Sequence, residues 1–298
     1  LAKKTFMLSS SSDGATAYRV LAYCIDIEGN KSKTAEYSVI IDTCNYYIDG
    51  SADSEEDKEK ANGSKDAPYS SFAEIVPFLK NSRFLRINVK GNVSVPDERI
   101  VINSNCSLQG SQDARLILGP KTNFDIRNSS FSFADILISF TEQDFSRETA
   151  NIFNVERGVL FFSNVEMNCL FGKNGTAINS DNSVINIENS GITVSASVYS
   201  CVISAVQSKL NVKKSRISTV ADTAVNFSAQ GGLFELKDSE CKVTASLGRI
   251  AELFDTYSTI TGNDFSGDLK NRAGNGVAVY MDKKNHSVGY SDNSEAGF

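Results

Sequence analysis

The sequence contains no tryptophan, only four prolines and a single histidine in 298 residues. So little proline excludes collagen-like, proline-rich linker and mucin-like chains. A basic excess is also missing, because 30 Lys and Arg against 36 Asp and Glu give a formal charge of −6. We therefore expect no binding to nucleic acid through phosphate neutralisation. No apolar run approaches the roughly 18 residues of a membrane-spanning helix, so no transmembrane segment is expected.

We expect no signal peptide within the first ten residues. Residues Leu1 to Ser10 lack the apolar core and cleavage site of a signal peptide. Because the chain begins with Leu, we expect a piece of a larger precursor or a trimmed form of the chain, with any export signal outside this sequence.

The cysteines are few and irregularly spaced. They form no C-x-x-C pair and no metal-ligand spacing, so a zinc site is not expected. An even count in an exported protein leaves disulfides open. We nevertheless predict mostly unpaired thiols that act as small core residues. The six are Cys24, Cys44, Cys106, Cys169, Cys201 and Cys241.

Residues 1–44 have the pattern of a β-hairpin. Two β-rich segments, 17–27 and 34–42, flank a turn at Gly29-Asn30. If the strands pair about that turn, the numbers of two residues that face each other should sum to about 59. The segment 18–32 resembles the last two strands of the immunoglobulin-like modules of bacterial surface proteins and chitobiase-type enzymes. The resemblance implies that residues 1–44 are a remnant of such a module, and we expect the hairpin to pack on the domain that begins at residue 45.

The next stretch, residues 45–83, combines a strand, an acidic loop and a helix. Tyr46 to Asp49 form the strand, and the acidic loop 51–66 does not match the ligand spacing of an EF-hand. A capping box, Ser71-Phe-Ala-Glu74, then starts a short amphipathic helix. Its apolar residues have helical spacing, and Pro77 is expected to kink it.

From about residue 84 the sequence repeats. Octapeptides that start at 131, 160, 185, 210 and 234 share apolar residues at positions 1 and 3, which is the alternation of a strand, and a degenerate sixth copy starts at 260. A repeat of this length indicates stacked coils. Position 5 is predicted to form a sharp bend, because short polar residues tolerate the left-handed conformation. The bend residues are Asp135, Asn164, Asn189, Lys214, Asp238 and Asp264.

A second motif supplies another strand in each coil and ends in a polar residue. These polar ends are predicted to stack into an outward ladder of amides and hydroxyls that bonds the coils together. The ladder consists of Asn154, Asn179, Ser204, Asn226 and Asp255. With three short strands per coil, the coils must stack at ~4.8 Å to bury their apolar faces. The predicted fold is all-β, a right-handed parallel β-helix of seven or eight coils.

The I-x-I-x-N-S-x-I unit resembles the repeat of the pectin-lyase-like superfamily. The segment from Tyr46 to Glu74 is similar to the start of many exported bacterial β-helix proteins, in which the amphipathic helix caps the open end. Units such as Ile152-Phe-Asn154 are similar to polymorphic outer-membrane proteins and adhesin passengers, although the Gly-Gly-Ala-Ile partner motif of those proteins is missing. The resemblance implies a β-helix domain over residues 45–298. It also implies an exported protein that is secreted, displayed on the cell surface or associated with the outer membrane.

The sequence offers no convincing catalytic set. Members of this superfamily include calcium-dependent polysaccharide lyases and glycosidases, which need clustered carboxylates. The expected ladder has one acid, and His286 lies outside the regular repeats. The candidate bases are Arg127 near Asp125, Arg216, and Lys213 with Lys214, each expected to be a surface charge. We predict no catalytic residue, no metal and no cofactor, with Ca²⁺ at Asp238 and Asp264 as the alternative.

These observations leave two functional hypotheses. The first is a non-catalytic, monomeric module that displays a binding face for a glycan or a host surface protein. The second is a polysaccharide lyase or glycosidase with a groove along the β-helix, bordered by the loops 141–150 and 171–175. A structure in which two or more carboxylates and an Arg or Lys converge in a concave groove would rule out the first hypothesis.

Overall fold

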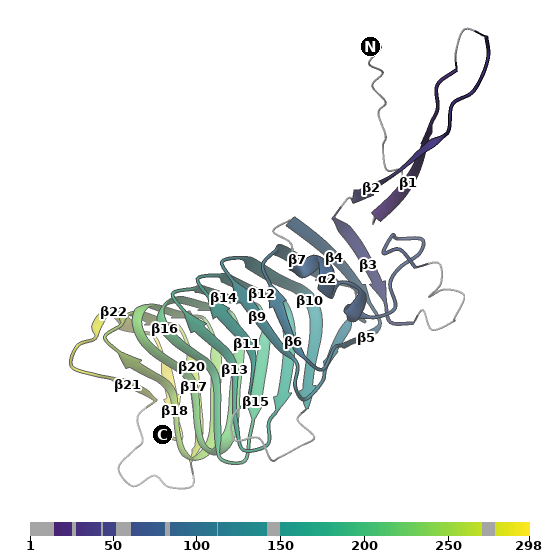
Figure 1. The fold of residues 1–298 in the computed structure, drawn as a ribbon. Coiled ribbons are helices and arrows are strands. Elements are labelled where there is room, and N and C mark those ends of the chain that lie inside the picture. Colours follow the sequence, from purple (N-terminus) through teal and green to yellow (C-terminus); the bar gives the residue numbers. More distant parts are fainter. Residues whose placement is uncertain are drawn as a thin grey trace.

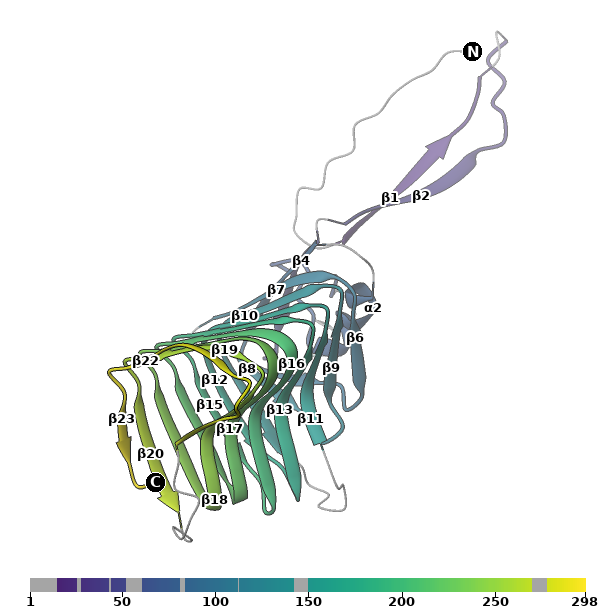
Figure 2. The same ribbon diagram turned by 90° about the vertical axis from the view of Figure 1, so that its left-hand side faces the viewer.

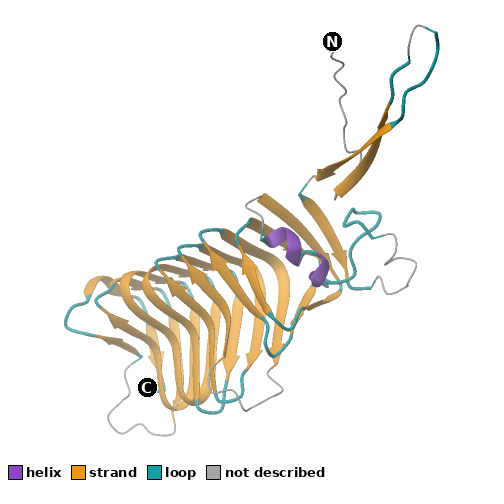
Figure 3. Ribbon diagram, in the orientation of Figure 1, coloured by secondary structure: helices purple, strands orange, loops and turns teal. Residues whose placement is uncertain are grey.

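The computed structural model describes residues 15–25, 28–42, 44–51, 61–80, 84–111, 113–141, 150–269 and 278–298. From residue 45 onward the chain winds into a stack of parallel β-strands (Figure 1), and almost no helix is present (Figure 3). The predicted all-β parallel β-helix is therefore confirmed. No helix of the described residues is long and apolar enough to cross a membrane.

The strands of the solenoid form three parallel sheets, here called A, B and C. Five long strands bend and contribute to more than one sheet, and Figure 2 shows successive coils lying one behind another. Sheet C contains a strand from each of eight successive coils, within the seven or eight that we predicted.

Sheet A contains β3 (Asn45–Asp49), β4 (Phe84–Lys90), β7 (Asn105–Gly110), β10 (Ser130–Thr141), β12 (Val159–Leu170), β14 (Val184–Glu188), β16 (Tyr199–Lys213), β17 (Arg216–Lys237), β19 (Tyr257–Thr261) and β22 (His286–Ser291). Sheet B adds β5 (Asn92–Val95), β8 (Arg115–Leu118), β15 (Gly191–Ser195), β18 (Glu240–Phe254), β20 (Asp264–Leu269) and β23 (Ser294–Ala296) to parts of β10, β12 and β17. Sheet C adds β6 (Arg99–Ile102), β9 (Asn123–Arg127), β11 (Ala150–Glu156), β13 (Asn174–Asp181) and β21 (Val279–Met281) to parts of β16, β17 and β18.

The register of sheet A agrees with the repeat predicted from the sequence for five copies. Phe131, Leu160, Ile185, Leu210 and Phe234 stack in one inward column. The sixth copy is corrected, because Phe234 pairs with Ser258 and not with Ile260. Ile260 lies opposite Leu236, at the third position of the octapeptide. Ser258 is buried where an apolar residue was expected, so the apolar pattern matched two residues too late.

Aromatic side chains fill the first coils of the core. Phe124 stacks on Phe153 with ring centroids 5.2 Å apart, and Phe133 lies 5.4 Å from Phe162. All four are fully buried. Such pairs stabilise beyond their area burial by about 0.5–1.5 kcal/mol each. The N-terminal coils are therefore tied together by a continuous aromatic cluster.

A short helical segment closes the N-terminal end of the stack, as the capping box predicts. It comprises η1 (Phe72–Glu74) and α2 (Val76–Leu79), shown in purple in Figure 3, with Pro77 in the first turn of α2. The Glu74 carboxylate accepts hydrogen bonds from the backbone N–H groups of Ser70 and Ser71, each 3.0 Å long. Phe72 meets Phe124 edge-on at 6.0 Å, so this segment covers the open core.

The N-terminal hairpin pairs β1 (Ala15–Ala22) with β2 (Ala35–Asp42) in antiparallel register. Ala15 lies opposite Asp42, so opposing numbers sum to 57, two less than the turn predicts. Figures 1 and 2 show the hairpin projecting away from the solenoid, so the expected packing against the domain that begins at residue 45 is wrong. Its origin in an immunoglobulin-like module stays a prediction. Most of the acidic loop, residues 52–60, lies outside the described residues.

All six cysteines lie in the described part of the chain, and Cys24, Cys106, Cys169, Cys201 and Cys241 are free, which agrees with the expectation of mostly unpaired thiols. Four are buried, Cys24 is exposed and Cys44 is half-buried.

Candidate functional site

The structure places five of the six expected bend residues in the left-handed conformation. Asp135, Asn164, Asn189, Lys214 and Asp238 have φ between 48° and 53°. Asp264 is a correction, because it lies in β20 opposite Glu240 and the bend of that coil is made by Gly262, with φ 68°. Glycine adopts this conformation without the steric penalty of a Cβ. Asp264 was predicted as a bend because the sixth repeat was aligned two residues too late.

A second column of left-handed residues connects sheet C to sheet A. It includes Arg157, Asn182, Gln207 and Asp255, with φ between 47° and 51°. Asp255 therefore forms a bend and does not belong to the polar ladder where we expected it.

The outward polar column of sheet C, here called the polar column, contains three of the five expected ladder residues. Asn154, Asn179 and Ser204 pair in register, and the column continues with Asp125 on one side and with Ser228 and Glu252 on the other. Asn154 Nδ2 donates to Asn123 Oδ1 at 3.1 Å, and Asn179 Nδ2 lies 3.5 Å from Asn154 Oδ1.

Asn226 is a further correction to the ladder. It is fully buried and its Oδ1 accepts a hydrogen bond of 2.7 Å from Thr219 Oγ1. It occupies a position that is apolar in other coils, so Ala224-Val-Asn226 imitates the apolar-apolar-polar motif two residues too early. Leu210 and Phe234 are 24 residues apart. The same interval applied to the polar column places Ser228 after Ser204, and Glu252 after Ser228.

A buried hydroxyl ladder, which we did not expect from the sequence, runs along the bends between sheets A and B. The backbone N–H of Val165 donates to Ser190 Oγ, that of Ser190 to Ser215 Oγ, and that of Ser215 to Ser239 Oγ, at 3.1–3.2 Å. Asn263 continues the ladder by accepting from the Ser239 N–H at 3.0 Å. The available signal was the serine directly after the bend residue in three consecutive octapeptides.

Charged side chains gather at the N-terminal end of the polar column. Here Arg99, Asp125, Arg127 and Glu156 line a hollow of about 410 Å³, called the charged hollow, which Asn154, Asn179 and Ser204 extend. The Asp125 carboxylate is 4% exposed and is ion-paired with Arg99 and, at 3.0 Å, with Arg127. Asp125 raises the pKa of Arg127 through this hydrogen bond. The side chains of both arginines remain partly exposed, so a buried carboxylate holds two guanidinium groups near the surface.

The other expected surface charges lie apart from this hollow. Arg216 pairs with Glu166 on sheet B at 2.6 Å, and Lys213 pairs with Glu235 on sheet A at 3.7 Å. Lys214 is exposed at its bend. His286 is corrected, because it starts β22 and stacks on Tyr257 of the preceding coil with ring centroids 4.6 Å apart. Within the described ranges, no group of three or more His, Cys, Asp or Glu could hold a metal ion.

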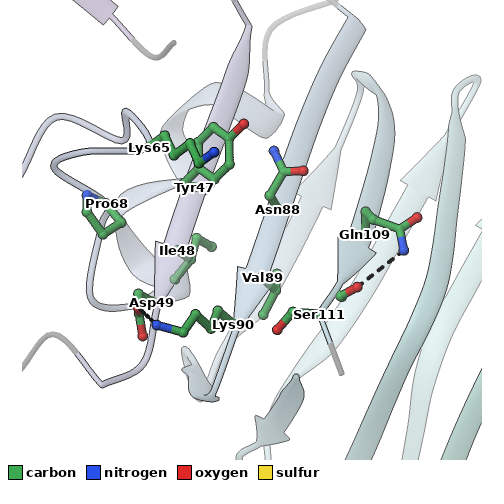
Figure 4. Close-up of a pocket in the computed structure, with 11 residues that line it drawn as sticks. Tyr47, Ile48, Asp49, Lys65, Pro68, Asn88, Val89, Lys90, Gln109 and Ser111 are labelled. Carbon is green, nitrogen blue, oxygen red and sulfur yellow. Dashed lines mark hydrogen bonds and ion pairs between the residues drawn. The ribbon is translucent and has the colours of Figure 1, made fainter. Parts of the chain in front are cut away.

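A second concave site lies near the N-terminal end, on the outer face of sheet A (Figure 4). This N-terminal pocket of about 400 Å³ is lined by β3, β4, β7 and the segment 61–71. Tyr47, Asn88 and Gln109 occupy the same register position on three successive coils. Beside them, Lys90 Nζ lies 2.8 Å from Asp49 Oδ2.

Comparison with known proteins gives only distant likenesses. No protein-family model and no curated protein sequence matches the chain. Two solved structures of pectin methylesterase from Aspergillus niger, in deglycosylated and penultimately deglycosylated form, are 12% and 13% identical, with TM-scores of 0.42 and 0.44; each comparison covers 87% of this chain and 91% of the other. A GH136 lacto-N-biosidase from Eubacterium ramulus is 8% identical with a TM-score of 0.27, covering 85% of this chain and 67% of the other. Similarity at this level carries no information about activity.

Proposed function

We propose that this chain is an exported β-helix module that binds a glycan along the outer face of sheet C without transforming it. The polar column is the observation that carries the proposal. Asp125, Asn154, Asn179, Ser204, Ser228 and Glu252 present one polar side chain per coil. Parallel strands lie ~4.8 Å apart, so these groups form a regular row that can contact successive units of an extended polymer.

The charged hollow supports this binding face. Side chains of Arg99 and Arg127 are 58% and 44% exposed, and both are anchored by the buried Asp125. Because guanidinium groups donate several hydrogen bonds in a fixed plane, they suit oxygen-rich ligands such as the hydroxyl and carboxylate groups of glycans. Anchoring reduces the side-chain freedom that is lost when a ligand binds.

A polysaccharide lyase or glycosidase is the second candidate. Asp125 and Glu156 lie in one hollow with two arginines, which is close to the convergence that would rule out a binding module. However, both oxygens of Asp125 already accept hydrogen bonds from Arg127, and Glu156 is held by Arg157 at 2.8 Å. These ion pairs occupy the two carboxylates that a proton transfer or a nucleophilic attack requires, so binding is the better-supported function.

Arg127→Gln tests the proposal, with Arg216→Gln on sheet B as the matched control. Binding of the purified chain is screened on a glycan array and quantified by calorimetry. We expect Arg127→Gln to weaken binding about tenfold or more, as for a central contact, and Arg216→Gln to leave it unchanged. Equal affinities of the two variants contradict the proposal. New reducing ends or unsaturated products in a turnover assay, lost in Asp125→Asn and Glu156→Gln, support the enzyme instead.

The cellular setting belongs to the same proposal. We place the protein outside the cell, secreted or held at the cell surface or outer membrane, as a monomer whose partner is a glycan or a host surface protein. The acidic net charge supports a partner other than nucleic acid. Immunogold labelling of intact cells and light scattering of the purified chain test the location and the monomeric state.

A further inference from the structure

We propose that the N-terminal pocket is a separate binding site for a neutral sugar ring, which stacks on Tyr47 and donates its hydroxyl hydrogens to Asn88 and Gln109. The pocket opens on sheet A, whereas the polar column lies on sheet C. The inference therefore stands or fails independently of the glycan face proposed above.

One wall of the pocket is fixed by backbone hydrogen bonds. The segment 61–71 runs along β3, where Tyr47 N–H donates to Gly63 O, Tyr69 N–H to Tyr47 O, and Asp49 N–H to Tyr69 O, each at 2.9 Å. These bonds hold Lys65 and Pro68 beside the strand, on the side of the pocket opposite Gln109 and Ser111 (Figure 4). The concavity therefore exists before a ligand arrives, which lowers the entropy lost on binding.

The floor is largely apolar. Tyr47 is half-buried and faces outward, while its neighbour Tyr46 is fully buried and packs 4.7 Å from the Phe78 ring. Pro68 adds further apolar surface, and the core residues Ile48 and Val89 are buried behind the pocket. An aromatic ring held over a packed core offers a rigid platform for the apolar face of a pyranose.

The polar groups of the pocket have a defined preference. Asn88 Nδ2 donates to Asn45 Oδ1 and Tyr46 O, at 3.0 and 3.1 Å. Gln109 Nε2 donates to Gly110 O and Asp135 Oδ2, at 3.2 and 2.6 Å. Both amide nitrogens are thus engaged, whereas none of the described residues donates a hydrogen bond to the side-chain oxygen of either amide. Two carbonyl oxygens without a donor among the described residues, on adjacent coils, suit a ligand that brings donors.

This preference for hydrogen-bond donors indicates the class of ligand. A sugar ring combines an apolar face for Tyr47 with adjacent hydroxyl donors for the two amide oxygens. A carboxylate or phosphate has no donors and suits these oxygens poorly. Lys90, held by Asp49, supplies a donor to a ring or glycosidic oxygen at the edge.

The test titrates the purified chain with hexaoses of glucose, xylose, mannose and galactose, and with tetragalacturonate as the acidic probe. Tyr47→Ala removes the platform, Tyr47→Phe retains it, and Gln109→Leu removes one acceptor. Phe84→Ala is the matched control, because Phe84 is an exposed aromatic residue of β4 outside the pocket. Calorimetry measures affinity, and thermal unfolding verifies that each variant folds.

At least one neutral hexaose should bind. We expect about a tenfold loss in Tyr47→Ala and a several-fold loss in Gln109→Leu, with Tyr47→Phe and Phe84→Ala within about twofold of the parent. Binding that survives in folded Tyr47→Ala overturns the proposal, as does a preference for tetragalacturonate or a failure of every neutral hexaose to bind. Arg127→Gln should leave this affinity unchanged, which separates the pocket from the sheet C face.

Discussion

The backbone N–H of Ser190 donates to Oγ of Ser215 on the next coil, 3.2 Å away. The Ser215 hydroxyl in turn donates to the carbonyl of Lys213 at 2.7 Å. Each hydroxyl of this buried ladder thus satisfies a backbone donor of the preceding coil and a backbone acceptor of its own coil. Without these side chains, the bends would bury unpaired backbone groups.

Ser215→Ala should destabilise the fold by about 1–3 kcal/mol, because it leaves the buried N–H of Ser190 without an acceptor. Urea unfolding of the two proteins measures the difference. Ser218→Ala is the control, since Ser218 lies three residues away on the outer face of sheet B, and its expected effect is within about 0.5 kcal/mol. Equal losses in both variants contradict a role for the ladder.

Lys214 is a long side chain in a left-handed bend, with φ 48°. Lys214→Asn should raise the free energy of unfolding by up to about 1 kcal/mol, because Asn tolerates this conformation better. Lys214→Val should lower it by about 1–2 kcal/mol or more, because a β-branched residue is strained there. The control is Lys213→Val, a change at an exposed strand residue. Thermal denaturation in parallel ranks the four proteins, and a Val variant of Lys214 as stable as that of Lys213 is the adverse result.

Two glycines of the solenoid should respond differently to alanine. A Cβ on Gly110 meets the backbone carbonyl of Asp135, which the bend holds in place. Gly110→Ala should therefore destabilise the protein by at least about 2 kcal/mol. The atoms nearest to a Cβ on Gly191 belong to the carboxylate of Glu166, an exposed side chain that can move. Gly191→Ala should lower the free energy of unfolding by about 1 kcal/mol at most, because it disturbs only the surface ion pair between Glu166 and Arg216. Chemical denaturation compares them, and the reverse order counts against this view of the packing.

The buried thiols predict a dependence of stability on alkaline pH. Burial raises the pKa of Cys106, Cys169 and Cys241, and raises that of Cys201 to about 12. Since an unfolded thiol titrates near ~8.5, the unfolded chain releases protons that the folded chain retains. Stability is therefore fully present below about pH 8.5 and falls above it, by about 1.4 kcal/mol per pH unit for each thiol.

Cys241→Ala tests this dependence. The variant should be less stable at every pH because of the cavity it creates. Between about pH 9 and 10.5, however, its free energy of unfolding should fall less steeply with pH than that of the parent, by the contribution of one thiol. Cys24→Ser, at an exposed position, should keep the parent slope. Denaturant midpoints over this range supply the slopes, and parallel curves for Cys241→Ala and the parent are incompatible with the prediction.

Strands, coils and five bends could be predicted from the repeats between Phe131 and Phe234. Stacking in register sets the spacing of successive repeats and imposes the same chemistry on every coil. The ladder was predicted only in part. Asn226 and Asp255 match the local motif in sequence, but the first is buried against Thr219 and the second forms a bend. A three-residue motif does not reveal on which side of the sheet its polar member lies.

The two concave sites were harder to foresee for a different reason. Tyr47, Asn88 and Gln109 belong to the least regular coils, and they meet only through the register of three strands. The charged hollow likewise depends on Arg99, which reaches Asp125 from the preceding coil. Only the proximity of Arg127 to Asp125 could be expected, because those two residues are neighbours along a single strand.

The fixed interval between stacked positions has a consequence for how the chain acquires its structure. From Leu160 to Ser258, each new coil finds its partners 24 or 25 residues back along the chain. Coils can therefore be added one at a time without ever closing a longer loop, and the entropy lost at each addition stays nearly constant. Folding of such a stack can nucleate at any coil, and the capped, phenylalanine-rich N-terminal coils offer one template on which further coils can wind.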